Sequence, residues 1–309
     1  MIRKDQLPKI WGDEWRLPEG TDPQLLPIPA GAEVKVVITD DPWTVERLAG
    51  KAVCCPSTAL LKIDVAAGAS LQLYRLQGLG TPVQILTETQ ITMQRDSRLR
   101  MCTITLGGLQ VRNNVTVRMQ DEGCDVEANG LYLLDREQQC DNYIFVEHAK
   151  PHCTSRELYK GIVDDSARAR FNGHVLVQDG AVKTEAHMTN RNILLTDKAH
   201  VDTRPFLEIY NDDVKCSHGS TIGQLDEQAL FYLRQRGITE RTAMTMLSYA
   251  FCDEVIRHVG IESLRDTLGD MVKKRLHGEL APLCDECATP CTSPCNGTEA
   301  NFKIDPEKL

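Results

Sequence analysis

Hydrophobic and polar residues alternate with a period of two over most of the chain, from about residue 31 to residue 222. Val34, Val36 and Ile38 form one such run, and further runs lie at 61–65, 71–73, 83–85, 115–117, 144–146 and 175–177. Gly, Asn and Asp separate these runs. The pattern therefore predicts many short β-strands joined by tight turns. A sandwich, a barrel and a β-helix all fit it, and no repeating βαβ layout does.

After residue 222 the period changes to that of a helix. Apolar residues recur at helical spacing in three segments, 226–236, 239–258 and 262–276. Gly237 is a natural stop for the first segment, and Thr239 is a good N-cap for the second. Residues 223–278 are therefore predicted to form a small C-terminal helical domain.

The two ends of the chain lack either period. Residues 1–30 are rich in Pro and contain Trp11 and Trp15, which indicates an irregular leader packed on a larger body. Residues 279–309 form a Cys-rich tail with four cysteines spaced closely enough to surround one metal: Cys284, Cys287, Cys291 and Cys295. Four thiolates can hold zinc or an iron–sulfur cluster. The alternative is a tail whose thiols bind nothing.

Composition narrows the function classes. The net charge is −9, and 41% of residues are hydrophobic and 26% charged, with no long run of one sign. A nucleic-acid partner and an anionic membrane surface both call for a basic patch, so neither is expected. No stretch approaches 18 apolar residues, and the N-terminus lacks the apolar core of a signal peptide. We expect a cytoplasmic protein whose twelve cysteines are thiols or metal ligands.

The junction between the β body and the helices carries a family resemblance. Residues 212–219 read Asp-Asp-Val-Lys-Cys-Ser-His-Gly, preceded by Leu-Glu-Ile at 207–209 and followed by Phe-Tyr-Leu at 231–233. Further matching stretches lie at 130–133, 148–155, 171–173 and 188–195. This ordered string resembles the SufB/SufD family of SUF iron–sulfur cluster assembly scaffolds. Where SufB members carry a Cys, six residues before the motif His, this chain has Asp212, which is the SufD form.

The resemblance implies a fold and a set of partners. It selects a right-handed parallel β-helix for residues 31–222, followed by the helical domain at 223–278. It implies pairing with a SufB-like sister subunit, or with a second copy, and docking of the ABC ATPase SufC on the C-terminal helices. The assembly would build a transient iron–sulfur cluster and pass it to client apo-proteins. The family's helical N-terminal region is shorter here, and the Cys-rich tail lies outside the family pattern.

Two residues of the motif could hold metal. Cys216 and His218 stand two apart, so on one strand their side chains share a face, and thiolate and imidazole are both ligands for iron or zinc. The resemblance implies that His218 faces the sister subunit where the cluster forms. The structural alternative is a buried Cys216 and a hydrogen-bonded His218 before a turn.

The first predicted helix supplies the candidate docking surface for the ATPase. Phe231, Tyr232, Arg234 and Arg236 are our candidates, because aromatic residues and Arg are common interface anchors. Packing of this helix on the β body is the alternative.

Several enzyme classes lack support in the sequence. No Gly-x-x-x-x-Gly-Lys-Ser/Thr loop is present, so ATP hydrolysis by this chain alone is not expected. Gly-x-Ser-x-Gly and His-Glu-x-x-His are also absent. Two alternatives to a non-catalytic scaffold stay open: a metal-binding or redox module built on the tail, and a polysaccharide-active β-helix using acids such as Asp121, Glu122 and Asp125.

Overall fold

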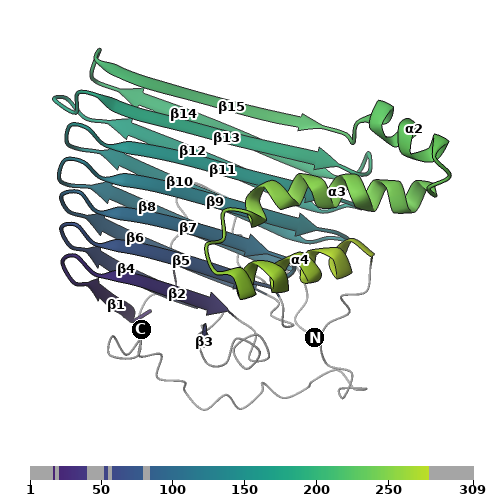
Figure 1. Ribbon diagram of the computed structural model, residues 1–309, viewed down its shortest axis with the longest axis horizontal. Helices are drawn as coiled ribbons and strands as arrows, with labels where there is room; N and C mark the ends of the chain where they lie inside the picture. Colours follow the sequence, from purple (N-terminus) through teal and green to yellow (C-terminus); the bar gives the residue numbers. More distant parts are fainter. Residues whose placement is uncertain (1–16, 18–20, 40–51, 55–57, 79–83, 278–309) are drawn as a thin grey trace.

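The chain winds into a parallel β-solenoid of about six turns, followed by three helices (Figure 1). The structure, a computed structural model, describes residues 17, 21–39, 52–54, 58–78 and 84–277. The predicted β-helix and the C-terminal helices are confirmed. The four tail cysteines and both Trp residues of the leader lie outside the described residues, so the predictions made for them stay predictions.

Over most of the solenoid, each turn contributes one strand to each of two sheets. The seven-stranded sheet A contains β1 (Pro23–Ile28), β4 (Thr58–Val65), β6 (Gln84–Met93), β8 (Gln110–Met119), β10 (Gln139–His148), β12 (Arg168–Val177) and β14 (His200–Ile209). The eight-stranded sheet B contains, in stacking order, β15 (Val214–Gly223), β13 (Thr184–Leu194), β11 (Thr154–Val163), β9 (Asp125–Leu134), β7 (Arg98–Thr105), β5 (Ser70–Gln77), β2 (Glu33–Thr39) and β3 (Ala52–Cys54). All neighbouring strands run parallel, as a solenoid requires.

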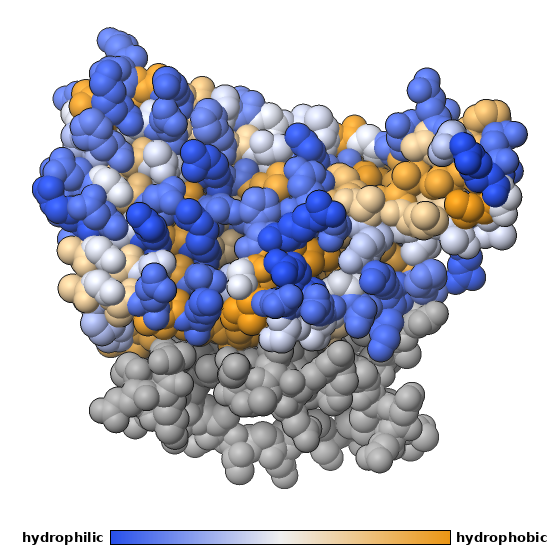
Figure 2. Space-filling view, viewed as in Figure 1, coloured by the Kyte–Doolittle hydropathy of each residue, from blue (hydrophilic) through white to orange (hydrophobic). Residues whose placement is uncertain are grey.

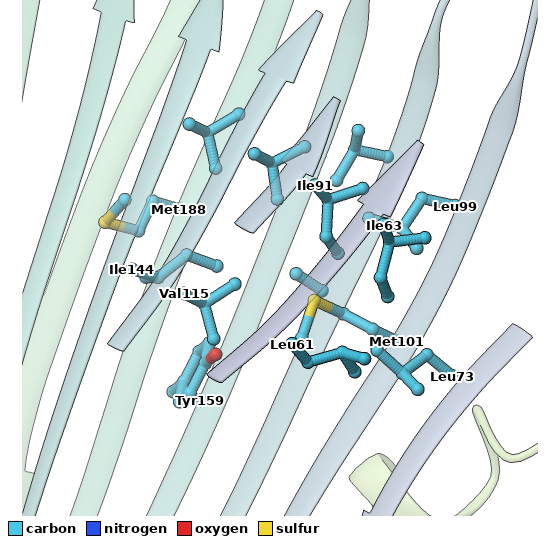
Figure 3. Packing of buried hydrophobic residues seen from close by; sticks show 14 of the residues in the cluster. Leu61, Ile63, Leu73, Ile91, Leu99, Met101, Val115, Ile144, Tyr159 and Met188 are labelled. Carbon is cyan, nitrogen blue, oxygen red and sulfur yellow. The ribbon is translucent and has the colours of Figure 1, made fainter. Parts of the chain in front are cut away.

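The inner faces of the two sheets pack against each other to form one long apolar core (Figure 3). Aliphatic side chains stack in rows from coil to coil; Ile63 and Ile91, for example, are partners in the β4–β6 register. This arrangement explains the period-two pattern, because every second residue of a strand points inward.

Helices α3 (Glu240–Ile256) and α4 (Glu262–His277) cover the outer face of sheet B (Figure 1). Outward residues of that sheet, such as Leu131 and Ile162, form a second apolar cluster with helix residues such as Val255 and Leu268. The buried Lys160 ammonium anchors α3 by donating to the Phe251 carbonyl at 2.9 Å. The helices are thus fixed to the solenoid by burial of their apolar stripes.

The helix boundaries predicted from the sequence agree well with the structure, because the predicted capping residues do cap the helices. The Asp226 side chain accepts hydrogen bonds at the start of α2 (Glu227–Gln235), and the Thr239 side chain accepts one at the start of α3. Gly237 ends the α2 segment with φ of +82°, a backbone conformation that glycine adopts without strain. α2 contains no buried residue.

The prediction of an irregular leader over residues 1–30 is wrong for residues 23–28, which form β1. This strand is at the edge of sheet A and pairs with β4 alone among the described strands. Leu26 and Ile28 point into the core, but Pro23 and Pro27 interrupt the alternation in sequence. An edge strand tolerates proline, because the missing N–H can face away from its neighbour.

Candidate functional site

Strands β14 and β15 end the two sheets on the same side of the solenoid (Figure 1). We call these two strands the open end. Within the described part of the chain, β14 pairs only with β12, and β15 pairs only with β13. Ten-residue edges with free N–H and C=O groups are templates for strand pairing, so natural proteins cover them or pair them.

Cys216 and His218 both lie in inward positions of β15. They pair in register with Ala186 and Met188, whose side chains are buried in the core. Cys216 packs against that core and is half-buried, whereas His218 is exposed. The two side chains therefore share a face, and the interior of the solenoid opens to solvent at His218.

Burial raises the pKa of the Cys216 thiol, although the Ala186 N–H hydrogen-bonds to the sulfur and opposes the effect. At neutral pH this side chain is a protonated thiol. A metal ion that bound Cys216 would have to displace the thiol proton, and this lowers the affinity of the site. Tight binding would therefore need a second ligand beside Cys216.

A buried acid lies beneath this pair. Glu157 of β11 pairs in register with Met188 of β13, which in turn pairs with His218 of β15. The three side chains all point into the solenoid, so Glu157 lies two strands below His218. Neither carboxylate oxygen is in hydrogen-bonding geometry with a described group. Burial raises the pKa of Glu157 to about 8, and the nearby Ser155 hydroxyl offsets only part of this effect. Sequence reasoning missed Glu157, because only the coil register shows that it points inward.

The β14 edge presents a mixed aromatic and charged surface. Its outward side chains after His200 are Asp202, Arg204, Phe206 and Glu208, and Tyr210 follows directly after the strand. Phe206 is 55% exposed and meets the His174 ring edge-to-face at 5.0 Å. It ends a row of stacked rings that runs from Phe145 through His174. A strand added beside β14 could therefore pack a side chain against the Phe206 ring.

A groove of about 560 Å³ crosses the outer face of sheet A and reaches this edge. Asn114, Tyr143 and Asn172 line its middle, with Glu88 toward one end and Arg204 toward the other. The acids considered for polysaccharide chemistry lie elsewhere, in the turn before β9 and at the first residue of that strand. Asp125 is bound to Arg100 at 2.7 Å, and Asp121 lies 3.5 Å from Arg95.

The predicted docking residues lie on α2 and at its C-cap, Arg236, and α2 buries no residue. Phe231 is 64% and Tyr232 57% exposed. The Arg236 guanidinium donates to the Tyr232 hydroxyl at 2.8 Å, and Arg234 lies 3.5 Å from Glu240. Apolar colouring gathers over α3 just below α2 (Figure 2). Met246 of α3 is also exposed. The helix thus carries an aromatic surface that no described part of the chain covers.

Within the described residues, no group of three or more His, Cys, Asp or Glu side chains is placed to hold a metal ion. Cys216 and His218 therefore do not form a complete metal site by themselves. Helices α2, α3 and α4 all lack the length or the apolar character that spanning a lipid bilayer requires.

Comparison with known proteins identifies the family. Residues 25–251 match the family described as SUF system FeS cluster assembly, SufBD core domain. The chain is 38% identical to the iron–sulfur cluster assembly protein SufD of Escherichia coli over 71% of its own length and 52% of that protein. It is 37% identical to a SufBD family protein of Synechocystis over 62% of its length and 42% of that protein. It thus spans about half the length of these curated relatives. The chain belongs to the SufB/SufD family of iron–sulfur cluster assembly proteins and is SufD-like within it.

Proposed function

We propose that this chain is a non-catalytic scaffold subunit of the SUF machinery, which pairs through its open end and docks an ABC ATPase through α2. The observation that carries the proposal is the open end of the solenoid, which no described strand covers and where His218 points inward and yet is exposed. A second subunit with a free edge would close both sheets and supply the ligands that Cys216 and His218 lack. A nascent iron–sulfur cluster, as cargo for client apo-proteins, would then form at this junction.

The outward face of β14 is self-complementary in an antiparallel arrangement. With Phe206 of two copies at the centre, Arg204 of each copy faces Glu208 of the other. Asp202 then faces the hydroxyl of Tyr210. Such a pattern of opposite charges about an aromatic centre fits an isologous contact.

The main chain of β14 also indicates that side chains, and not main-chain hydrogen bonds, would set the register between two paired β14 strands. The N–H groups of His200 and Tyr210 donate to β12 carbonyls or their flanking turns, so odd-numbered residues of β14 face the free edge. Pro205 lacks an N–H at the middle of that edge, so strand pairing there is interrupted. The charges and Phe206 would therefore set the register of a pair.

Charge reversal tests the pairing and the identity of the partner together. Arg204→Glu alone is expected to raise the dissociation constant of the pair about tenfold, because it places like charges opposite each other twice. The Arg204→Glu/Glu208→Arg double variant restores complementarity in a homodimer and should return the dissociation constant to near the wild-type value. Sedimentation equilibrium measures both.

A sister subunit of different sequence gives another result in the same experiment. The double variant would then stay weakened toward that subunit, as measured by titration calorimetry with the purified SufB-like protein. Unchanged association of the single variant with either partner would contradict pairing through β14.

The α2 surface is tested by removing its aromatic side chains. Phe231→Ala/Tyr232→Ala is expected to weaken binding of the cognate ABC ATPase at least about tenfold, because aromatic anchors dominate interface energies. The fold should persist, since α2 buries no side chain. Titration calorimetry gives the affinity, and Leu25→Ala, at an equally exposed residue on β1, is the control. An unchanged affinity would exclude α2 as the docking helix.

A further inference from the structure

Two cysteines lie in successive coils at the corner that enters sheet B. Cys124 directly precedes β9, and Cys153 directly precedes β11. The Thr154 N–H donates to the Cys124 carbonyl at 2.9 Å, and Asp125 pairs with Thr154 in the next rung. The two cysteines are thus neighbours in the coil stack, and both are at most 1% exposed.

The two thiols share one hydrogen-bond acceptor. The Asp121 carbonyl oxygen lies 3.3 Å from the Sγ of Cys124 and 3.3 Å from the Sγ of Cys153. The Ser97 hydroxyl is 3.8 Å from the Cys124 sulfur. The side-chain contact with Cys153 is the largest cause that lowers the pKa of Cys124; burial opposes it and the Ser97 hydroxyl adds to it, while the contact with Cys124 and burial raise the pKa of Cys153. Cys124 is therefore the sulfur that carries the negative charge when the pair loses a proton.

The stacked turns hold this arrangement in place. Gly123 has φ of +73°, and a Cβ there would lie 2.2 Å from the Asp96 carboxylate of the previous turn. Its N–H donates to the Pro151 carbonyl of the next turn at 3.3 Å. Adjacent strands lie about 4.8 Å apart, which is within the Cα separation of roughly 4.4–6.8 Å that a disulfide accepts.

We propose that Cys124 and Cys153 form a dithiol site that small two-electron oxidants, such as hydrogen peroxide, convert to a disulfide between successive coils. The Cys124 thiolate attacks one peroxide oxygen, the O–O bond breaks, and the released hydroxide takes up a proton to become water. The Cys153 sulfur then attacks the resulting sulfenic sulfur, the S–O bond breaks, and the hydroxide leaves with the Cys153 proton as a second water. Two thiols lose two electrons and two protons, and one peroxide is reduced to two waters.

Other buried cysteines lack this arrangement. Burial raises the pKa values of Cys102, Cys140 and Cys252 to about 12. No other described thiol hydrogen-bonds to any of the three. A thiol held protonated is a poor nucleophile, and a sulfenic acid without a neighbouring sulfur cannot resolve to a disulfide. The dithiol site is therefore expected to oxidise selectively among the described buried cysteines.

The disulfide would link β9 to β11, the two strands on which α3 rests. It would close a loop of about thirty residues, which restricts the unfolded chain and raises stability. Oxidation would therefore stiffen the part of the solenoid that carries the helices.

Mass spectrometry of the full-length wild-type protein tests the site directly. The metal-free protein is treated with hydrogen peroxide, quenched in acid with N-ethylmaleimide and digested without reductant. The expected product is a Cys124–Cys153 cross-linked peptide, with Cys102 and Cys140 still alkylated after denaturation. The melting temperature should rise by about 5 °C and return to the starting value with dithiothreitol.

Two variants complete the experiment. Cys124→Ser should abolish the cross-link and the rise in melting temperature, whereas Cys140→Ser, at an equally buried residue, should keep both. Separate alkylation of Cys124 and Cys153 after peroxide treatment would overturn the proposal. So would cross-links that join either cysteine mainly to another thiol.

Discussion

Replacing His218 with Ala is expected to lower the rate of iron–sulfur cluster assembly by the complete complex at least about tenfold, the usual effect of losing a group that supports a metal site. The side chain is exposed at the open end, so its loss leaves the core packing unchanged. Pairing with a partner should also persist, because the β14 contacts do not use His218. The variant thus separates cluster assembly from subunit association.

The measurement is the transfer of a cluster to an apo-protein, followed by its visible absorption under anaerobic conditions. His200→Ala is the matched control, since His200 is an exposed histidine on the neighbouring edge strand β14 and belongs to its outer face. It should assemble clusters at the wild-type rate. Equal rates for the wild-type protein and the His218 variant, with the complex intact, would remove His218 from the proposed site.

The expectation depends on a feature that sequence alone could not supply. The resemblance identified Cys216 and His218, and their spacing placed both on one face of a strand. An inward residue of a solenoid is normally buried by the coil stacked above it, as Met188 is. His218 is exposed because no described strand stacks beyond β15. His218 is therefore exposed because it lies in the last described coil, and the motif sequence alone does not show which coil is the last.

The β body was predictable as strands but not as a repeat. Coil spacing in the register varies from 26 residues, between Gln84 and Gln110, to 37 residues, between Pro23 and Leu60. A period that drifts by eleven residues does not appear as internal similarity. Outward residues of sheet B are also apolar beneath α3 and α4, which weakens the alternation further. The family resemblance was needed to choose the β-helix.

Contacts between residues of successive coils could not be predicted from the sequence for the same reason. Arg112 and Asp141 form a buried ion pair, and Cys124 and Cys153 share an acceptor, yet each pair is separated by 29 residues in sequence. Only the register brings them together. The helices were easier, because their caps and stripes are local signals that need no knowledge of tertiary contacts.

Glu157→Gln is expected to stabilise the protein, and the gain should grow with pH. Burial raises the pKa of Glu157 from 4.5 to about 8, so the folded state holds this proton more tightly than the unfolded state does. Stability contributed by the protonated form is complete below pH 4.5 and is lost as the pH rises through 8. At about 1.4 kcal/mol per pKa unit, the loss by pH 9 is on the order of 4 kcal/mol, and glutamine avoids it.

Urea unfolding at a series of pH values between 4 and 9 measures this difference. The free energies of unfolding of the two proteins should nearly coincide at pH 4 and separate steadily above it. Glu185→Gln is the control, because that carboxylate is exposed and bound to Lys215, which lowers its pKa, so no gain that grows with pH is expected. Parallel curves for wild type and Glu157→Gln would contradict the assignment. They would mean that the Glu157 carboxylate is compensated inside the solenoid, by a cation or by water, directly beneath the residues assigned to cluster assembly.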